Sequence, residues 1–291
     1  RGKRWGEAEV RLKSVGGKTQ NKDKQQMIPK QAVGRGEVYR RFAAQYDLLC
    51  SHQDVNGNLL QVLNDLLQRH QRRRCLSNSS SVDYLNDPWI VVDLGMGTGK
   101  IERLLSTVGV PLVVFGCDRS LHMVEFAHKN NISHKGNQMT SDGEIVADSR
   151  RVPMRDHVAD VVIAGWSLSE IKAENFVGDW RKEVSLAMNE MHRAVKNGGT
   201  IMILETMGCG VSEPTRSGSH LHKLFEASGF HHQWIRTDFE FESQQEAEEL
   251  CCFFFKKNGS RTKGNFTLQQ SSTTGKPILF EVTGIWWKDV N

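Results

Sequence analysis

The stretch that most constrains this chain is residues 90–100, with the sequence IVVDLGMGTGK. Four apolar residues interrupted only by Asp93 predict a short buried strand, and Gly95, Gly97 and Gly99 follow it at alternate positions. Glycine is needed where the backbone takes a positive φ or approaches a ligand with no Cβ in the way. Residues 101–108 predict a helix just after the glycines, so free N–H groups and a partial positive charge are expected at the turn. We therefore expect a polar ligand there.

Two common phosphate-binding motifs fit this stretch poorly. A P-loop needs glycine six positions before the lysine and Ser or Thr after it, but Leu94 and Ile101 occupy those positions. A dinucleotide fingerprint needs glycine at the sixth position of G-x-G-x-x-G, where this chain has Lys100. Nor does that fingerprint call for an acid on the preceding strand, where this chain has Asp93.

The stretch matches the pattern D-x-G-x-G-x-G and so resembles the first motif of class I S-adenosylmethionine-dependent methyltransferases. The resemblance implies a cofactor-binding loop that packs against the methionine part of S-adenosylmethionine. It also implies that Asp93 helps to hold the cofactor's ammonium group. The loop residues expected to contact the cofactor are Gly95, Met96, Gly97 and Gly99. A glycine-rich turn that binds nothing is the alternative.

A second acid stands at the end of a second apolar stretch. Residues 111–117 predict a buried strand, and Asp118 follows about 20 residues beyond the glycine turn, where a doubly wound sheet places an acceptor for ribose hydroxyls. The run from Asp118 to Met123 has a D-x-S-x-x-M pattern that again resembles the family. Arg119 and Met123 are therefore candidate cofactor contacts, although Met123 is equally a candidate for the core.

A third acid follows the short strand predicted over residues 144–147. The family resemblance implies that Asp148 hydrogen-bonds the adenine amino group and that Ser149 offers a backbone N–H beside it. A loop or helix-capping aspartate is the alternative for Asp148.

The fourth predicted strand, residues 160–164, opens into the run GWSLSE. Ligands of open α/β sheets bind outside the carboxyl ends of the strands, so Trp166, Ser167 and Glu170 are expected to face the reacting methyl group. Trp166 is also a candidate cofactor contact, because its ring can lie against a sulfonium cation. A helix over residues 183–194, a strand over 200–204 and a long loop over 205–219 complete this part.

Methyl transfer from a sulfonium needs alignment more than acid or base catalysis, so no obligatory catalytic motif is expected. A general base is required only if the acceptor is protonated. The weak catalytic candidates are Trp166, Glu170, His220 and His222, with His192 as a further possible base. A solvated surface histidine is the alternative for each of the three histidines.

Composition excludes several classes of protein. The 291 residues are 25% charged and 38% hydrophobic, and no apolar run has the length of a membrane span or of a signal-peptide core. Six scattered cysteines without a C-x-x-C pair predict neither zinc nor a disulfide framework, so no metal is expected. The expected location is cytoplasmic, with nucleus and mitochondrion left open.

The positive charge is concentrated at the N-terminus. Residues 1–41 hold 12 Lys/Arg and four Asp/Glu, a net charge of +8, whereas the rest holds 26 bases and 30 acids, a net charge of −4. Residues 1–35 therefore predict a disordered basic arm that binds nucleic acid, directs import or merely solvates the terminus.

The expected architecture is an α/β fold: a doubly wound, mostly parallel seven-stranded sheet with an antiparallel last strand, helices on both faces and an N-terminal helical extension. Residues 36–82 form the predicted helical cap, and 83–291 the methyltransferase domain. The cap's apolar spacing predicts two helices, with Tyr46 over the cofactor mouth or in the core, and a polar linker over 71–81. The C-terminal part predicts a strand over 231–241, a helix over 243–255, a polar excursion over 256–277 and a last strand over 278–287.

The function expected from these features is transfer of a methyl group from S-adenosylmethionine to an O, N or C nucleophile of a small molecule. No Asn-Pro-Pro-Tyr tetrapeptide follows the fourth strand, which argues against methylation of amino groups on DNA bases or glutamine. RNA or protein methylation through the basic arm, and a catalytically inactive scaffold of the same fold, are the alternatives. A nicotinamide-dependent oxidoreductase is a further one, with Lys100 against it. The sequence predicts no membrane partner and does not determine an oligomeric state.

Overall fold

The computed structural model describes residues 39, 41–77, 87–133, 139–215, 219–255 and 267–291. The basic arm predicted over residues 1–35 lies outside these residues. Among the helices that are described, none combines the length and the apolar character needed to cross a membrane.

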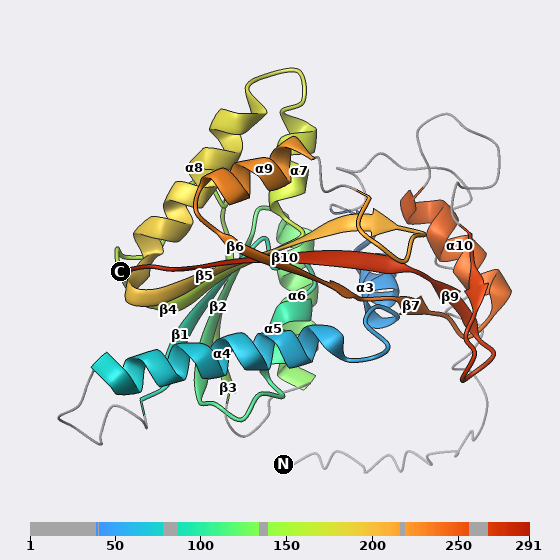
Figure 1. Cartoon of the computed structure of the whole chain (residues 1–291), viewed down its shortest axis with the longest axis horizontal. Helices are drawn as coiled ribbons and strands as arrows, with labels where there is room; N and C mark the ends of the chain where they lie inside the picture. The colour runs from blue at the N-terminus through green and yellow to red at the C-terminus, as the bar shows by residue number, and fades with distance from the viewer. Residues whose placement is uncertain (1–38, 40, 78–86, 134–138, 216–218, 256–266) are drawn as a thin grey trace, which may run out of the picture.

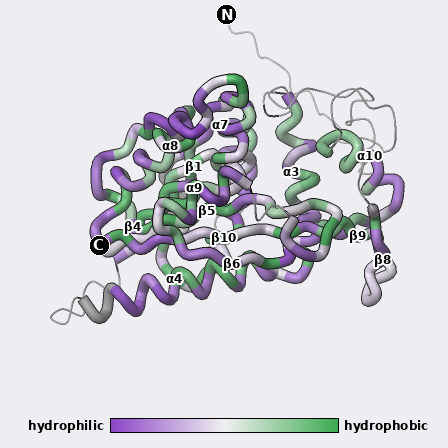
Figure 2. Tube along the Cα trace, turned by 45° about the horizontal axis from the view of Figure 1, so that its top comes forward, coloured by the Kyte–Doolittle hydropathy of each residue, from purple (hydrophilic) through white to green (hydrophobic). Residues whose placement is uncertain are grey.

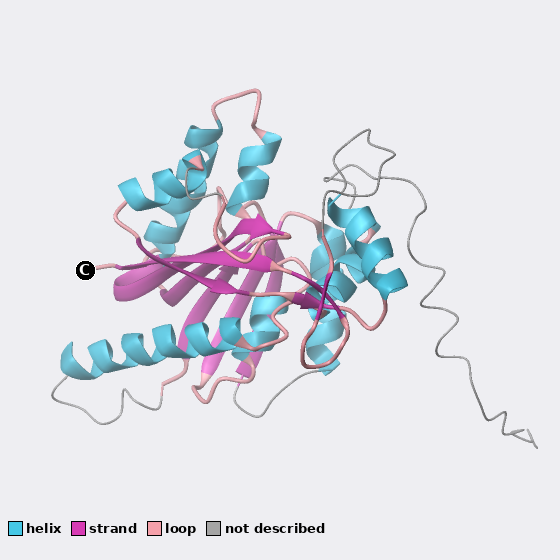
Figure 3. Cartoon of the chain, turned by 45° about the vertical axis from the view of Figure 1, so that its right-hand side comes forward, coloured by secondary structure: helices cyan, strands magenta, loops and turns pink. Residues whose placement is uncertain are grey.

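The centre of the fold is a seven-stranded sheet in the order β3-β2-β1-β4-β5-β10-β6, seen as a fan of arrows in Figure 3. Its strands are β1 (Trp89–Leu94), β2 (Leu112–Asp118), β3 (Met139–Val146), β4 (Ala159–Gly165), β5 (Val195–Cys209), β6 (His231–Arg236) and β10 (Glu281–Asp289). The first five pair in parallel, whereas β10 runs antiparallel to both β5 and β6. The predicted doubly wound sheet with an antiparallel last strand is confirmed.

Helices cover both faces of this sheet (Figure 1). They are α4 (Asn58–Ser77), α5 (Lys100–Leu105), α6 (Leu121–Ser133), α7 (Leu168–Glu174), α8 (Trp180–Ala194) and α9 (His220–Ala227). Alternate residues of β5 separate the two layers: Ile203 packs with α8 and α9, and Leu204 packs with α4 and α5. This alternation follows from the two-residue period of a strand that is buried on both faces.

The two N-terminal helices have different positions. Helix α3 (Ala43–Ser51) brings Tyr46 toward the carboxyl edge of the sheet, while α4 lies along one face. The turns of α4 alternate between apolar and polar in Figure 2, because Leu59, Leu63 and Leu67 face the sheet.

The polar linker predicted over residues 71–81 is wrong for residues 71–77, because α4 continues to Ser77. Arg73 donates a 2.8 Å hydrogen bond to Thr200 Oγ1 and pairs with Asp289 at 2.8 Å. These contacts fix a strongly polar helical end against β5 and β10. Residues 78–81 lie outside the described part of the chain.

A second, three-stranded sheet in the order β7-β9-β8 stands beside the main one. It consists of β7 (Phe239–Glu240), β8 (Gln269–Gln270) and β9 (Pro277–Leu279), and it packs with α10 (Gln244–Phe255) in a small apolar cluster. The helix predicted over 243–255 is confirmed, but the strands predicted over 231–241 and 278–287 are each divided in two. Asp238 causes the first break, since its carboxylate pairs with Arg236 and accepts the Glu281 N–H.

The loop predicted over residues 205–219 is wrong for its first five residues. Strand β5 continues to Cys209 because β10 pairs with it that far, Glu281 lying opposite Cys209. The additional strand length places Glu205 and Thr206 at the carboxyl edge of the sheet. Part of the excursion predicted over 256–277 lies outside the described residues.

Candidate functional site

The loop after β1 has the backbone geometry that its glycines predict. Gly95, Gly97 and Gly99 have φ angles of +75°, +55° and +81°, in the left-handed region that favours glycine. The N–H groups of Gly95 and Met96 both donate to the Cys117 carbonyl, at 2.7 and 3.0 Å. The turn is therefore fastened to the end of β2 before α5 begins.

Gly95 is also required by close packing. A Cβ built there would lie 2.4 Å from the Ser167 Cβ, and Ser167 Oγ donates a 2.8 Å hydrogen bond to the Leu94 carbonyl. The loops after β1 and β4 thus touch through the space that the missing side chain leaves. The position of Gly97 is open by comparison, since a Cβ there would meet only Tyr46 Cε1, at 3.6 Å.

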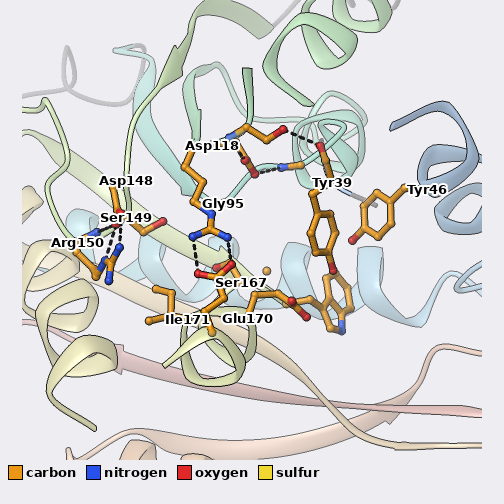
Figure 4. Close-up of a pocket in the computed structure, with 16 residues that line it drawn as sticks. Tyr39, Tyr46, Gly95, Asp118, Asp148, Ser149, Arg150, Ser167, Glu170 and Ile171 are labelled. Atoms are coloured by element: carbon orange, nitrogen blue, oxygen red, sulfur yellow. Dashed lines mark hydrogen bonds and ion pairs between the residues drawn. The ribbon is translucent and has the colours of Figure 1, made fainter. Parts of the chain in front are cut away.

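A pocket opens at this point, outside the carboxyl ends of the parallel strands, as the predicted architecture requires (Figure 4). Nine of the predicted site residues line it: Gly95, Gly97, Asp118, Arg119, Asp148, Ser149, Trp166, Ser167 and Glu170. The remaining lining residues are Tyr39, Tyr46, Ser120, Arg150, Gly165, Ile171 and Glu174. The structure therefore brings together residues from four strand ends and from α3.

Asp118 connects the glycine loop to the start of α6. Its carboxylate accepts hydrogen bonds from the Gly97 N–H at 3.0 Å and the Ser120 N–H at 2.8 Å. Burial raises the pKa of this carboxyl, and the two N–H donors oppose that shift. A carboxylate has about four acceptor positions, so two bonds leave capacity for a ligand in the pocket.

Asp148 is an ion-paired carboxylate at the pocket wall. Arg150 donates to both of its oxygens, from Nε at 2.9 Å and Nη2 at 2.6 Å. The side-chain hydrogen bond from Arg150 lowers the pKa of Asp148, so this group stays ionised. Arg150 also pairs with Glu183 of α8 at 2.5 Å, which ties the loop to the helix layer.

Four predicted contact residues do not line the pocket: Asp93, Met96, Gly99 and Met123. Met96 and Met123 are core side chains, 4% and 0% exposed. Gly99 caps the N-terminus of α5. These residues shape the loop from beneath or pack under it.

Asp93 is a buried carboxyl beneath the loop, 0% exposed. Neither of its oxygens has a hydrogen-bond partner among the described residues. Burial raises the pKa of Asp93 well above its usual value, and the nearby carboxyls of Glu102 and Asp118 raise it further. Its direct contact with a ligand ammonium remains a prediction, while its depth indicates a role under the loop.

Trp166 is held in an unusual conformation at the end of β4. Its φ is +52°, which costs a residue with a side chain roughly 1–2 kcal/mol. Its N–H donates to the Leu204 carbonyl at 2.7 Å, and Lys100 Nζ lies 5.2 Å from the centre of its ring. A strained aromatic residue in a pocket wall is a feature of binding sites.

Sequence reasoning missed several lining residues, among them Tyr39, Arg150 and Glu174, whereas Tyr46 was predicted to lie over this pocket or in the core. Tyr39 and Tyr46 form an edge-to-face pair with centroids 5.5 Å apart, and the Tyr39 carbonyl accepts the Ser120 hydroxyl at 2.6 Å. Arg119 pairs with Glu174 across the pocket. Glu174 lies four residues after Glu170. Residues at this spacing share one face of a helix, so the sequence could have placed Glu174 beside Glu170 in the pocket wall.

The predicted histidine bases lie away from this pocket. His220 is exposed at the start of α9, and His222 is 3% exposed and packs against Trp286, with ring centroids 4.7 Å apart. His192 lies on α8 near Phe230, and burial lowers its pKa. Glu170 is therefore the one predicted base that lines the pocket. Among the described residues, no group of three or more His, Cys, Asp or Glu could hold a metal.

The family model and the relatives that this chain resembles are all described as methyltransferases. Residues 92–203 match the family model described as a methyltransferase domain. The demethylmenaquinone methyltransferase of Thermotoga maritima is 28% identical over 171 residues, 58% of this chain and 60% of that protein. The malonyl-[acyl-carrier protein] O-methyltransferase of Xylella fastidiosa is 26% identical over 141 residues, 48% of this chain and 42% of that protein. The matched part thus spans less than two thirds of either relative.

Among solved structures, the magnesium protoporphyrin IX methyltransferase of Synechocystis, with bound S-adenosylmethionine, is 15% identical. The match covers 86% of this chain and 93% of that one, with a TM-score of 0.39.

Replacement of Gly95 by alanine is expected to destabilise the protein more than the same change at Gly57. Both glycines have a positive φ, +75° and +69°, but a Cβ at Gly57 meets nothing within 4 Å. Gly57→Ala should therefore cost only the conformational term, about 1–2 kcal/mol, and Gly95→Ala about 1–3 kcal/mol more through the clash with Ser167. Urea unfolding measures both free energies, and equal losses would contradict the packing described for Gly95.

Replacement of Asp93 by asparagine is expected to change how stability depends on pH. The folded protein binds a proton at Asp93 more tightly than the unfolded chain does, so the free energy of unfolding falls as pH rises above the unfolded pKa of about 3.9. Asp93→Asn removes this contribution and should lose less stability than wild type between about pH 4 and pH 7. The exposed Asp65→Asn variant should follow wild type. Parallel curves for Asp93→Asn and wild type would show that Asp93 is not buried.

Proposed function

Through residues 92–203 the chain belongs to the class I methyltransferases, and from this premise we propose that it transfers the methyl group of S-adenosylmethionine to an oxygen, nitrogen or carbon atom of a small molecule. The observation that carries the proposal is that Asp118 and Asp148, at the ends of the neighbouring strands β2 and β3, line one pocket together with Gly95 and Gly97 of the glycine loop. A nucleoside with two hydroxyls and an amino group matches two such acceptors.

The charge of the pocket fits this cofactor. Its described lining holds four carboxylates, Asp118, Asp148, Glu170 and Glu174, against the two guanidinium groups of Arg119 and Arg150. S-adenosylmethionine carries an ammonium, a sulfonium and one carboxylate, so it is a net cation that a negatively charged pocket attracts. The rings of Tyr39, Tyr46 and Trp166 add faces that favour a cation.

Each lining group has a proposed role. Asp118 accepts the ribose hydroxyls, and Asp148 with the Ser149 N–H holds the adenine edge. The backbone at Gly95 and Gly97 lies against the methionyl part, since only a bare backbone allows that approach. Arg119 can pair with the cofactor's carboxylate after its ion pair with Glu174 separates.

The pocket must open to admit the cofactor. Its free volume of about 90 Å³ is below the roughly 300–1,000 Å³ of pockets that hold ligands of this size. The Arg119 and Glu174 side chains are 51% and 33% exposed, and such solvated ion pairs contribute only about 0–1 kcal/mol. Separation of this pair is therefore a low-cost way to open the pocket.

The cofactor supplies a methyl group already activated on a positive sulfur, and the protein's part is alignment. Trp166 and Tyr46 would form the wall that excludes water from the reacting face. Glu170, on α7 at the pocket edge, is the candidate to accept a proton from an acceptor that is protonated at working pH. Its role as base depends on the acceptor.

The acceptor is proposed to be a small or carrier-linked molecule. The names of the two relatives refer to demethylmenaquinone and to malonyl groups on acyl-carrier protein, respectively. RNA or protein methylation through residues 1–35 depends on a segment outside the described residues. A cytoplasmic location likewise remains a prediction.

Titration with S-adenosylmethionine tests cofactor binding. Wild type should bind it, and Asp118→Asn should bind about 10- to 100-fold more weakly, because a hydrogen bond to a charged group contributes about 1.5–3 kcal/mol. Asp65→Asn, on the outer face of α4, should bind as wild type does. Circular dichroism checks that Asp118→Asn remains folded. Equal affinities for all three proteins would contradict the assignment of Asp118.

Labelled cofactor in cell extract then identifies the acceptor class. Label should enter small metabolites, while label in RNA or protein would support the alternative acceptor. Binding without transfer to any fraction would indicate a scaffold, and binding of NADH in place of S-adenosylmethionine would indicate an oxidoreductase.

A further inference from the structure

A second cavity lies on the far side of α7 from the pocket described above. It has a volume of about 230 Å³ and is bounded by α7, the end of β5 and the start of α9, two helices that lie together on one face of the sheet in Figure 1. Ser169, Lys172 and Ala173 of α7 face this cavity, whereas Glu170, Ile171 and Glu174 line the first pocket. The periodicity of the helix therefore gives each cavity its own set of side chains.

Glu205 is the unusual group of this second cavity. It lines the cavity but is only 1% exposed, so it lies at the inner end. One oxygen, Oε1, accepts the Ser169 N–H at 2.8 Å, while Oε2 is buried with no hydrogen-bond partner among the described residues. A buried acceptor without a partner is costly, and functional sites are where such costs are retained.

Burial and a neighbouring carboxyl both disfavour the charged form of Glu205. Burial raises its pKa to about 7, the hydrogen bonds from Ser169 oppose the shift, and the neighbouring carboxyl of Glu170 raises it further. Lys172 also lines the cavity, and its ammonium lies 4.9 Å from the centre of the Trp180 ring. His222, at the opposite wall, packs against Trp286.

Part of the cavity lining is apolar. Phe176 lines it and is 75% exposed, and Leu221 adds an aliphatic wall. An exposed aromatic ring beside a buried carboxylate suits a ligand that has a cationic head and an apolar body.

We propose that this cavity is a second ligand site, which takes an organic ammonium compound whose N–H groups donate to Glu205 Oε2 and whose apolar part lies against Phe176. The ammonium supplies a hydrogen-bond donor to Oε2, which has none among the described residues, and a positive charge beside the carboxylate. The site is separate from the proposed cofactor pocket and does not depend on methyl transfer.

Calorimetric titration of the full chain with benzylammonium chloride, in the absence of S-adenosylmethionine and at about pH 8, tests this site, because Glu205 is then ionised. Wild type should bind benzylammonium, and Glu205→Gln should bind it about 10- to 100-fold more weakly. The glutamine keeps an oxygen for the Ser169 N–H, but it loses the charge and has an NH2 donor where Glu205 has the acceptor Oε2. Benzyl alcohol, which has the same ring and no charge, should bind wild type more weakly by a similar factor.

Two further variants keep the test decisive if Glu205→Gln folds poorly. Ala173→Trp places a large side chain at an exposed cavity-lining position and should abolish binding while Glu205 remains. Glu226→Gln, an exposed change on α9 outside the cavity, should bind as wild type does. The proposal is overturned if wild type does not bind benzylammonium, or if Glu205→Gln or Ala173→Trp binds it with wild-type affinity. Because no cofactor is present, these results are independent of methyl transfer.

Discussion

The structure depends on a close crossing of backbones at Gly95. Three strand ends meet there: β1 supplies the loop, the β2 carbonyl of Cys117 accepts two of its N–H groups, and Ser167 after β4 fills the space of the missing Cβ. Neither the turn nor the contact with Ser167 allows a side chain. Because these constraints coincide, the position of the loop relative to β2 and β4 is fixed by the fold before any ligand binds.

From this crossing follows the arrangement of charge. Parallel strands end at the same edge, so the acids that follow β2 and β3 lie on one rim of the pocket and Glu170 of α7 on another. Those at the rim remain partly solvated or ion-paired, as Asp148 is with Arg150. Asp93, beneath the glycine loop, and Glu205, at the end of β5, are buried and have raised pKa values. The same part of the sheet thus provides a solvated pocket for a cation and two buried carboxyls. Burial raises the pKa of both carboxyls, so each binds a proton more readily than an exposed one.

Much of this could be predicted from the sequence because it rests on local patterns. Continuous apolar runs in β1 and β4 predict strands buried on both faces, and glycines after such a run predict the turn. Asp118 and Asp148 could be placed at the pocket because they directly follow strands. The sequence does not show how deeply a side chain is buried. The motif names Asp93 as a contact, but in the fold its side chain is buried, with the carboxyls of Glu102 and Asp118 near it.

Other features depend on partners distant in sequence. The arginine-rich end of α4 looks like a linker until Asp289, more than 200 residues away, pairs with Arg73. The length of β5 is set by β10, and Tyr39 reaches the pocket because its carbonyl bonds to Ser120. Such long-range pairs leave no periodic signal in a single sequence.

A crystal structure of the protein with S-adenosylhomocysteine bound tests the central claim most directly. The account predicts the ribose at Asp118, the adenine beside Asp148 and Ser149, the amino-acid end along Gly95 and Gly97, and Arg119 separated from Glu174. A nucleoside bound elsewhere, or a pocket that stays closed at saturating ligand, would contradict it.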